Sequence, residues 1–321
     1  MSIRIVGTGS ALPERKVTNE EIAELVDTSD EWIRERTGIG SRYVSTKETV
    51  ASLAADACVR ALRQAGREAE EVQLLLVATC TPEDALPCMA CQVQEKIGAV
   101  NAVAFDVNAA CAGFLFALNT AWAYIASGIY ENALIVGSEV LSKMIDWNDR
   151  GTCILFGDGA GAVMVEKCTQ GGVLGFVQHS DGKKGAVLTC GSRQLNNLYV
   201  KSSEGESYVQ MDGREVFSFA VKQIPLTIQQ ALEKAALAVG DVDLFVLHQA
   251  NKRIIDGIAR RLGVDISRFP MNLDRVGNTS SAAIPLLLDE LNREGRIEKG
   301  QIIVLSGFGA GLACGACVME W

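Results

Sequence analysis

The chain has 321 residues, 48% of them hydrophobic, which suits one large domain or two fused units of about 150 residues each. Its formal net charge of −9 at pH 7 excludes a broad nucleic-acid-binding surface, because such a surface needs an excess of positive charge. The first residues are too polar for a signal peptide, and no apolar run reaches the roughly 18–20 residues of a membrane span. We therefore expect a soluble, cytosolic protein that binds neither nucleic acid nor membranes.

In the first half of the chain, short apolar segments alternate with segments of helical periodicity. An amphipathic helix is predicted at Val50–Ala65, and an apolar strand follows within 70–80. A loop, a second helix and a turn that contains Asn108 lead to a helix that begins just after Cys111. This helix is apolar on nearly every side, so we expect it to be buried. An apolar strand at 133–138 closes the series.

The second half repeats this series at a constant separation of 170 residues. Its amphipathic helix is predicted at 218–238. Three matches with one separation indicate two copies of a single α/β unit. The matches are Asn108 with Asn278, Gly137 with Gly307, and the strand at 70–80 with the strand at 240–250.

Strands of four to eight apolar residues that alternate with helices predict mostly parallel sheets covered on both faces. Two such sheets in one chain predict an α/β fold of five layers, α-β-α-β-α. The first copy would span 1–170 and the second 171–321. The helices that start near Cys111 and Ser281 would form the shared middle layer. The polar segment 188–208 interrupts the second copy and is expected to form a loop or cap near the boundary between the copies.

Ten cysteines raise the question of disulfides or of a metal site. Disulfide scaffolds belong to short secreted chains, so free thiols are expected here. Two pairs have the C-x-x-C spacing of metal and redox sites, Cys88 with Cys91 and Cys314 with Cys317. The second pair lies in a predicted strand, where its side chains would point to opposite faces, and the first lacks the two further ligands that zinc needs. We expect no metal site.

Three residues fall at strand ends and helix starts of the two copies, where α/β folds place ligands. Cys111 stands at a helix N-terminus, which lowers the pKa of a thiol and favours the nucleophilic thiolate. His248 follows the first strand of the second copy, and Asn278 stands at a strand-to-helix turn. Taken singly, each has a structural alternative: a packed cysteine, a buried histidine and a helix-capping asparagine. Their joint placement, together with the glycine-rich turn GFGAG at 307–311, favours a catalytic site.

The motifs DVNAACAGF, HQAN and GNTSSAA, in this order, resemble those of the condensing enzymes of the thiolase superfamily, and most closely the β-ketoacyl-acyl carrier protein synthase III family. The resemblance covers essentially the whole chain. It implies a duplicated, five-layer thiolase-like fold and a homodimer. It also implies a decarboxylative condensation of a short acyl-CoA primer with malonyl-acyl carrier protein, which initiates fatty acid synthesis without a metal or other cofactor.

The resemblance also assigns roles to the residues of the site. Cys111 would attack the acyl-CoA and hold the acyl group as a thioester until malonyl-acyl carrier protein enters and loses CO2. His248 and Asn278 would donate hydrogen bonds to the malonyl thioester oxygen and so stabilise the enolate. The backbone N–H groups of Cys111 and Ala310 would form the oxyanion hole.

Contacts with the two substrates are implied in the same way. Trp32 would stack on the adenine of coenzyme A, with Arg36 and Arg150 near its phosphates; the structural alternative for Trp32 is a helix core contact. A helix predicted at 251–263 carries basic residues that would dock the acidic carrier protein, although a charged helix face is usually only solvated. These residues are Lys252, Arg253, Arg260 and Arg261.

The chain departs from the family pattern at two positions. Ala310 stands where glycine is usual, a change that keeps the backbone N–H. Leu86 stands where some members have a phenylalanine that walls the acyl pocket, so the smaller side chain leaves room for longer or branched primers. The alternatives to a fatty acid enzyme are a sister condensing enzyme of secondary metabolism, a thiol hydrolase, and a non-catalytic redox or metal protein.

Overall fold

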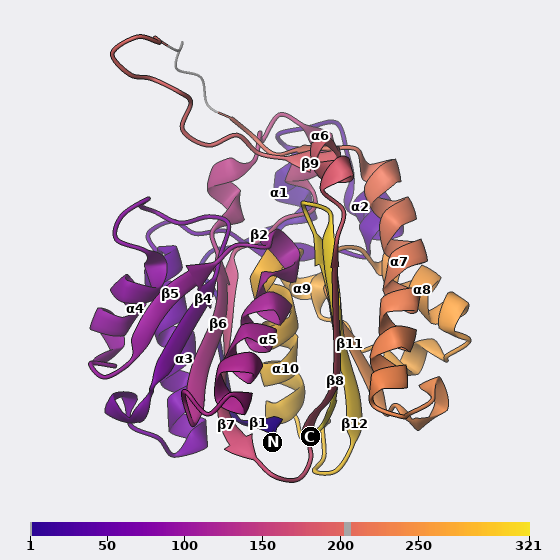
Figure 1. The fold of residues 1–321 in the computed structure, drawn as a ribbon. Coiled ribbons are helices and arrows are strands. Elements are labelled where there is room, and N and C mark those ends of the chain that lie inside the picture. Colours follow the sequence, from indigo (N-terminus) through magenta and orange to yellow (C-terminus); the bar gives the residue numbers. More distant parts are fainter. Residues whose placement is uncertain (1, 202–206) are drawn as a thin grey trace.

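Two β-sheets, a pair of helices between them and further helices on their outer faces make up the fold (Figure 1). The computed structural model describes residues 2–201 and 207–321. The first sheet has the order β1 (Ser2–Ala11), β7 (Gly159–Cys168), β6 (Asn132–Glu139), β4 (Leu74–Ala78), β5 (Val103–Val107). The second sheet has the order β11 (Leu244–Leu247), β12 (Ile302–Gly309), β13 (Ala313–Glu320), β8 (Gly172–Ser180).

The helices complete five layers, as predicted. Between the sheets lie α5 (Gly113–Ala126) and α10 (Ala283–Arg293), whose apolar side chains form one buried cluster with both sheets (Figure 1). The first sheet is covered on its outer face by α3 (Val50–Ala65) and α4 (Met89–Ile97). The second is covered by α7 (Gly213–Lys234) and α8 (Lys252–Leu262). The apolar middle helix is therefore buried because sheets pack on both of its sides.

Short elements connect these layers. β2 (Lys16–Thr18) pairs with β3 (Ser41–Tyr43), and β9 (Leu188–Thr189) pairs with β10 (Gln210–Met211). The short helices are α1 (Asn19–Ala23), α2 (Asp30–Thr37), α6 (Arg150–Cys153) and α9 (Leu273–Val276). The 3-10 turns are η1 (Ala69–Glu71), η2 (Ala110–Ala112), η3 (Leu141–Met144), η4 (Gly182–Val187), η5 (Val239–Asp241), η6 (Ile266–Arg268) and η7 (Ser280–Ala282).

Capping residues explain where the two amphipathic helices begin. The Thr49 side chain caps α3, which has the predicted bounds. The carboxylate of Asp212 accepts from the backbone N–H groups of Arg214 and Glu215 and so starts α7 at Gly213. The predicted range 218–238 is therefore wrong at both ends, because the cap lies earlier and the helix ends at Lys234.

Both sheets are mixed, which corrects the mostly parallel sheets expected from the sequence. β4 runs parallel to β5 and β6, and β11 runs parallel to β12. However, β7 is antiparallel to both β1 and β6, and β13 is antiparallel to both β12 and β8. A strand buried on both faces is apolar in either direction, so the hydrophobic pattern does not reveal which way it runs.

The repeat is visible in the backbone of the two copies. η2 and η7 begin 170 residues apart, as do α5 and α10, and β6 and β12. Ala110 and Ser280 both have a positive φ, +46° and +52°, which is uncommon outside glycine. In each turn the backbone N–H of the positive-φ residue donates to the side-chain oxygen of the asparagine two positions earlier. Ala110 donates to Asn108, and Ser280 donates to Asn278. The copies differ after β4 and β11: the counterpart of β5 is the short helix α9, not a strand.

The two C-x-x-C pairs differ in their surroundings. Cys314 and Cys317 are buried on opposite faces of β13, one facing α7 and the other the layer between the sheets. Cys88 and Cys91 stand at the start of α4, where their hydrogen bond raises the pKa of Cys91. In the described ranges, no three His, Cys, Asp or Glu side chains gather closely enough to hold a metal ion. Nor do those ranges contain a helix long and apolar enough to cross a membrane.

Candidate active site

Cys111 lies in η2, where the turn before the middle helix α5 meets the second sheet. Gly309, the last residue of β12, packs directly on this turn. A Cβ atom at Gly309 would lie 2.6 Å from the backbone N of Cys111 and 3.0 Å from that of Ala112. The position therefore requires glycine, and the close approach brings the following residue, Ala310, to the same cavity as Cys111.

A cavity of about 560 Å³ opens at Cys111 and is lined by residues of both copies. Part of its wall comes from the polar segment 188–208, as expected; residues 202–206 of that segment lie outside the described residues. Most of the remaining wall is apolar. The lining includes Cys80, Thr81, Cys111, Leu141, Lys143, Met144, Phe156, Leu188, Val209, Ser280 and Ala310.

The thiol of Cys111 is not poised as a thiolate. Burial raises its pKa to about 12, and the carboxylate of Glu139 raises the pKa further, while a hydrogen bond with the hydroxyl of Ser280 lowers it. The expectation that the helix N-terminus would depress this pKa is thus corrected, because desolvation is the larger effect. The raised pKa keeps the Cys111 thiol protonated at neutral pH.

His248 is buried directly after β11. Its backbone N–H donates to Ser306 of β12, and its ring stacks edge-on against Phe308 at 5.5 Å between centroids. Burial lowers the pKa of the imidazole to about 4, so it is neutral at pH 7. A neutral imidazole can donate one hydrogen bond from a ring nitrogen.

Asn278 is fixed by backbone and side-chain bonds. Its backbone pairs with the segment around Phe156, which also lines the cavity. Its Oδ1 accepts from the backbone N–H of Ser280 at 2.9 Å, which leaves the amide NH2 as the group that can donate to a substrate. As an asparagine at a turn it also stabilises η7, and this structural role is compatible with the expected catalytic one.

The structure thus gathers Cys111, His248 and Asn278 around one end of β12 and η7. The backbone N–H of His248 donates to the carbonyl of Ser306 in β12. Three residues further along this strand, Gly309 packs on the Cys111 turn. The side chain of Asn278 accepts a hydrogen bond from the backbone N–H of Ser280, and Ser280 lines the same cavity as Cys111. Only Cys111 borders the 560 Å³ cavity; His248 and Asn278 are buried beside it rather than in its wall.

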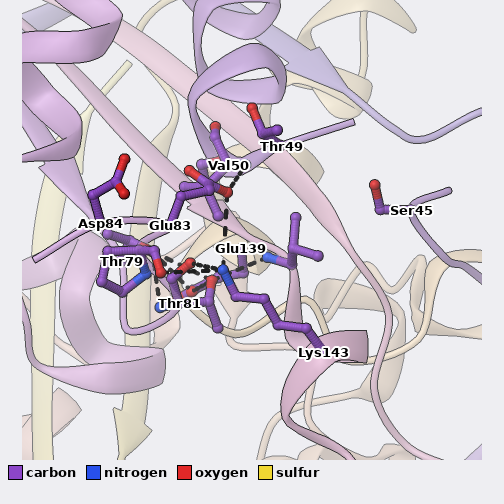
Figure 2. A network of polar contacts seen from close by, with 12 residues as sticks. Ser45, Thr49, Val50, Thr79, Thr81, Glu83, Asp84, Glu139 and Lys143 are labelled. Carbon is purple, nitrogen blue, oxygen red and sulfur yellow. Dashed lines mark hydrogen bonds and ion pairs between the residues drawn. The ribbon is translucent and has the colours of Figure 1, made fainter. Parts of the chain in front are cut away.

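Sequence reasoning missed Glu139, a fully buried carboxylate at the end of β6. Hydroxyl groups of Thr79 and Thr81 donate to its Oε2 at 3.1 and 2.6 Å, as the converging contacts in Figure 2 show. Ser280 and Ser281 of the other copy donate to its Oε1 at 3.1 and 2.7 Å. The available signal was a glutamate directly after the apolar strand at 133–138. It stands at the position that corresponds to Gly309 in the second copy.

Trp32, Arg36 and Arg150 come together although they are far apart in the sequence. The guanidinium groups of Arg36 and Arg150 lie 5.7 and 4.9 Å from the centroid of the Trp32 ring. Trp32 and Arg36 line a cavity of about 970 Å³, with Arg214 of α7, which the sequence did not single out. Val187, Gln210 and Met211 also line this cavity, and their neighbours Leu188 and Val209 line the Cys111 cavity. The two cavities are therefore adjacent.

The basic residues of α8 do not form one site. Arg253 lines a third cavity, of about 480 Å³, together with Arg36 and Arg214. Lys252 forms an ion pair with Asp256 at 2.8 Å. Arg260 and Arg261 are exposed in the last turn of the helix and border none of these cavities.

Leu86 does not wall the cavity of this chain. It is 87% exposed on the loop before α4 and is absent from the lining of the Cys111 cavity. In the single chain this loop turns outward to solvent, so the acyl-pocket role expected for Leu86 stays a prediction.

Known proteins resemble the chain over its whole length. Residues 105–182 match the model of the 3-oxoacyl-[acyl-carrier-protein (ACP)] synthase III family, and residues 232–321 match its C-terminal model. A β-ketoacyl-[acyl-carrier-protein] synthase III of Clostridium acetobutylicum is 47% identical over 100% of this chain and 99% of the relative. The chain belongs to the β-ketoacyl-acyl carrier protein synthase III family.

Solved structures agree with this assignment. The 3-oxoacyl-[acyl-carrier-protein] synthase III of Aquifex aeolicus superposes with a TM-score of 0.93 at 39% identity, covering 99% of this chain and 100% of that one. A priming β-ketosynthase from the R1128 polyketide pathway superposes with a TM-score of 0.93 at 38% identity, covering 99% and 96%. The fold is thus the thiolase-like fold of this family, and the chain is an acyltransferase that initiates type II fatty acid synthesis.

Proposed function

We propose that this enzyme catalyses condensation in two half-reactions, through an acyl group held on Cys111. A short acyl-CoA primer loads Cys111, and malonyl-acyl carrier protein then accepts the acyl group as it loses CO2. The product is a 3-oxoacyl-acyl carrier protein. The observation that carries this proposal is the placement of Cys111 in the wall of a largely apolar cavity, beside the backbone of β12 and next to a second cavity.

In the loading step, the Cys111 sulfur attacks the thioester carbon and the coenzyme A thiolate leaves. The negative charge that develops on the thioester oxygen needs fixed donors in a site with little water. The backbone N–H groups of Cys111 and Ala310 fit this role, since Gly309 brings β12 against the Cys111 turn and both residues border the cavity.

In the condensation step, loss of CO2 from the malonyl group leaves an enolate oxygen. His248 and Asn278 lie beside the cavity rather than in its wall, and we propose that they donate hydrogen bonds to that oxygen. Both groups are neutral and buried, so they stabilise the developing charge without adding a counter-ion that would hold the malonyl carboxylate. No base is required at His248, because departure of CO2 supplies the electron pair.

The 970 Å³ cavity is the candidate coenzyme A site. An aromatic ring flanked by two guanidinium groups matches a purine next to phosphates. Its position next to the Cys111 cavity lets a thioester reach the thiol while its nucleotide stays at Trp32. No separate cofactor is invoked, because the coenzyme A thioester is a substrate.

The acyl carrier protein is proposed to dock near Arg36, Arg214 and Arg253. These three residues line one cavity beside the coenzyme A site, although the chain as a whole carries a charge of −9. A local basic area on an acidic protein gives an acidic partner a defined place to bind. Arg260 and Arg261 are exposed further along α8, whereas the charge of Lys252 is paired with that of Asp256.

A homodimer is proposed from the free edge of the first sheet. β5 pairs with β4 on one side only, and Val103 on this strand is 50% exposed. An unpaired apolar strand edge favours pairing with another strand. The exposed Leu86 lies on a loop before the neighbouring helix α4, so an assembly at this edge would cover it. We place the enzyme in the cytosol.

The second candidate differs in the primer: it is the acyl or aroyl group that a condensing enzyme of secondary metabolism would load. The similarity to a priming β-ketosynthase of a polyketide pathway favours keeping this candidate. Primer preference separates the two: a fatty acid enzyme prefers short saturated acyl-CoA, and the alternative prefers another acyl or aroyl group.

The proposal is tested by product analysis with purified malonyl-acyl carrier protein and acyl-CoA. Mass spectrometry should show a 3-oxoacyl-acyl carrier protein with the wild type and none with Cys111→Ala. His248→Ala and Asn278→Ala should still take up the acyl group while decarboxylation falls by on the order of 10²-fold. Normal decarboxylation by both of these variants would remove the enolate role.

A further inference from the structure

Arg42 of β3 is a fully buried cation outside the residues that the two half-reactions use. Burial lowers the pKa of its guanidinium to about 10, so the group remains protonated at neutral pH. Within the described residues, both hydrogen bonds that it donates go to neutral oxygen atoms, and its Nε has no partner. Burying a cation without a hydrogen-bonded anion is strongly unfavourable. The charge of Arg42 therefore calls for a functional explanation.

The side chain of Arg42 connects two short helices. Its Nη1 donates to Oδ1 of Asn19 at 2.7 Å, and the amide of Asn19 donates at 2.8 Å to Asp30, the first residue of α2. Its Nη2 donates at 2.6 Å to the carbonyl of Ile154, the residue that caps the end of α6. One chain of hydrogen bonds thus runs from the start of α2 to the end of α6.

These two helices carry the aromatic ring and the guanidinium groups of the candidate coenzyme A site. Trp32 and Arg36 belong to α2, and Arg150 is the first residue of α6. The guanidinium of Arg150 lies 4.9 Å from the centroid of the Trp32 ring and also donates to the backbone oxygen of Asp27 at 2.9 Å. A contact between a cation and a ring face depends on their separation. The contact of Trp32 with Arg150 therefore depends on how α2 and α6 are placed.

We propose that Arg42 is a positioning residue of the coenzyme A site, which holds α2 and α6 so that Trp32 and Arg150 bind the nucleotide together. The inference rests on the proposed function, in which this site binds coenzyme A. Arg42 does not line the 970 Å³ cavity, so it acts through the two helices and not on the substrate. A guanidinium suits this role, because its rigid fork of N–H groups reaches two acceptors in fixed directions.

The test compares acylation of Cys111 by an acyl-CoA and by the N-acetylcysteamine thioester of the same acyl group, which has no nucleotide. Partial unfolding lowers both rates equally, so the ratio of the two second-order rate constants isolates recognition of the nucleotide. Arg42→Met should lower the constant for acyl-CoA about tenfold and leave the constant for the short thioester within about twofold. A ratio equal to that of the wild type would overturn the proposal.

The variants are chosen so that folding can be separated from positioning. Arg42→Met keeps the side-chain stem that packs against Gly157 and Gly277, next to the Asn278 turn. Asp30→Ala breaks the same chain of hydrogen bonds at a half-buried helix end and should also lower the ratio. Arg34→Ala is the matched control, because Arg34 bonds to Asp30 as well but is exposed on α2 itself. It should keep the wild-type ratio, and equal ratios in Asp30→Ala and Arg34→Ala would overturn the proposal.

Trp32→Ala distinguishes failure of this inference from failure of the proposed coenzyme A site. If Trp32→Ala keeps the wild-type ratio, coenzyme A binds elsewhere, and the inference falls with the site. If Trp32→Ala loses the preference for acyl-CoA while Arg42→Met keeps it, the inference alone is wrong. Calorimetry with coenzyme A itself makes the same comparison without acyl transfer, so it decides the matter even if Cys111 takes no acyl group. Arg42→Met should then bind coenzyme A about tenfold more weakly than the wild type.

Discussion

At the scale of residues, the surroundings of individual buried groups set the pKa values in the candidate site. Cys111 was recognisable in the sequence by its position before an apolar helix, but its protonation state was not. A helix N-terminus favours a thiolate by a modest amount, whereas desolvation depends on neighbours that are remote in the chain. Glu139 and Ser280 also shift the pKa of Cys111, by charge and by hydrogen bonding, and they belong to different copies of the repeat.

His248 should give the stability of the fold a pH dependence on the acid side. Folding lowers its pKa from 6.5 to about 4, so between these values the unfolded chain binds a proton that the native chain does not. Stability therefore rises with pH through this range and is complete above it. Between pH 7.5 and 5.5 the wild type should lose about 1.4 kcal/mol more than His248→Gln in urea unfolding. Equal losses would mean that native His248 titrates at its ordinary value.

At the scale of elements, the repeat predicted which segments of the two copies correspond to each other. The constant separation placed η2 opposite η7 and the end of β4 opposite the end of β11, and these are the elements that carry Cys111, Asn278 and His248. The hydrophobic pattern of the sequence did not reveal the direction of a strand or the path of a loop. β7 and β13 reverse direction, and the loop with Leu86 turns outward, because neither property changes the apolar periodicity.

The contact between β12 and η2 predicts a strong effect of one methyl group. Gly309→Ala should destabilise the protein by about 1–3 kcal/mol and slow acyl loading, because the new Cβ would lie 2.6 Å from the Cys111 nitrogen. Gly240→Ala is the control, since no atom lies within 4 Å of its Cβ position. Urea unfolding and the loading rate provide the measurement. Two variants with equal stability and activity would show that β12 does not hold the Cys111 turn.

At the scale of the whole molecule, the two copies share one middle layer and meet at the candidate active site. Cys111 comes from the first copy, while His248, Asn278 and Ser280 come from the second. Neither copy alone therefore contains the site. The composition and charge of the chain excluded broad classes of partner, but they did not identify the local basic area around Arg36, which only the folded chain assembles.

The free edge of β5 predicts the assembly. Val103→Lys should convert the proposed dimer to a monomer, because a charge on an exposed strand edge opposes pairing with a second copy. Ile266→Lys, at an exposed position in the other half of the molecule, should leave the dimer intact. Light scattering after gel filtration measures both. A Val103→Lys variant with the wild-type mass would place the interface elsewhere or leave the chain monomeric.

Acylation of Cys111 is the central claim and is measured by mass spectrometry. The protein is mixed with a panel of short straight and branched acyl-CoAs, and then the intact protein and its peptides are weighed. We predict the gain of one acyl group, located on the Cys111 peptide, and the ranking of acyl groups identifies the primer. An adduct on Cys80 instead of Cys111, or no adduct with any member of the panel, would contradict the account.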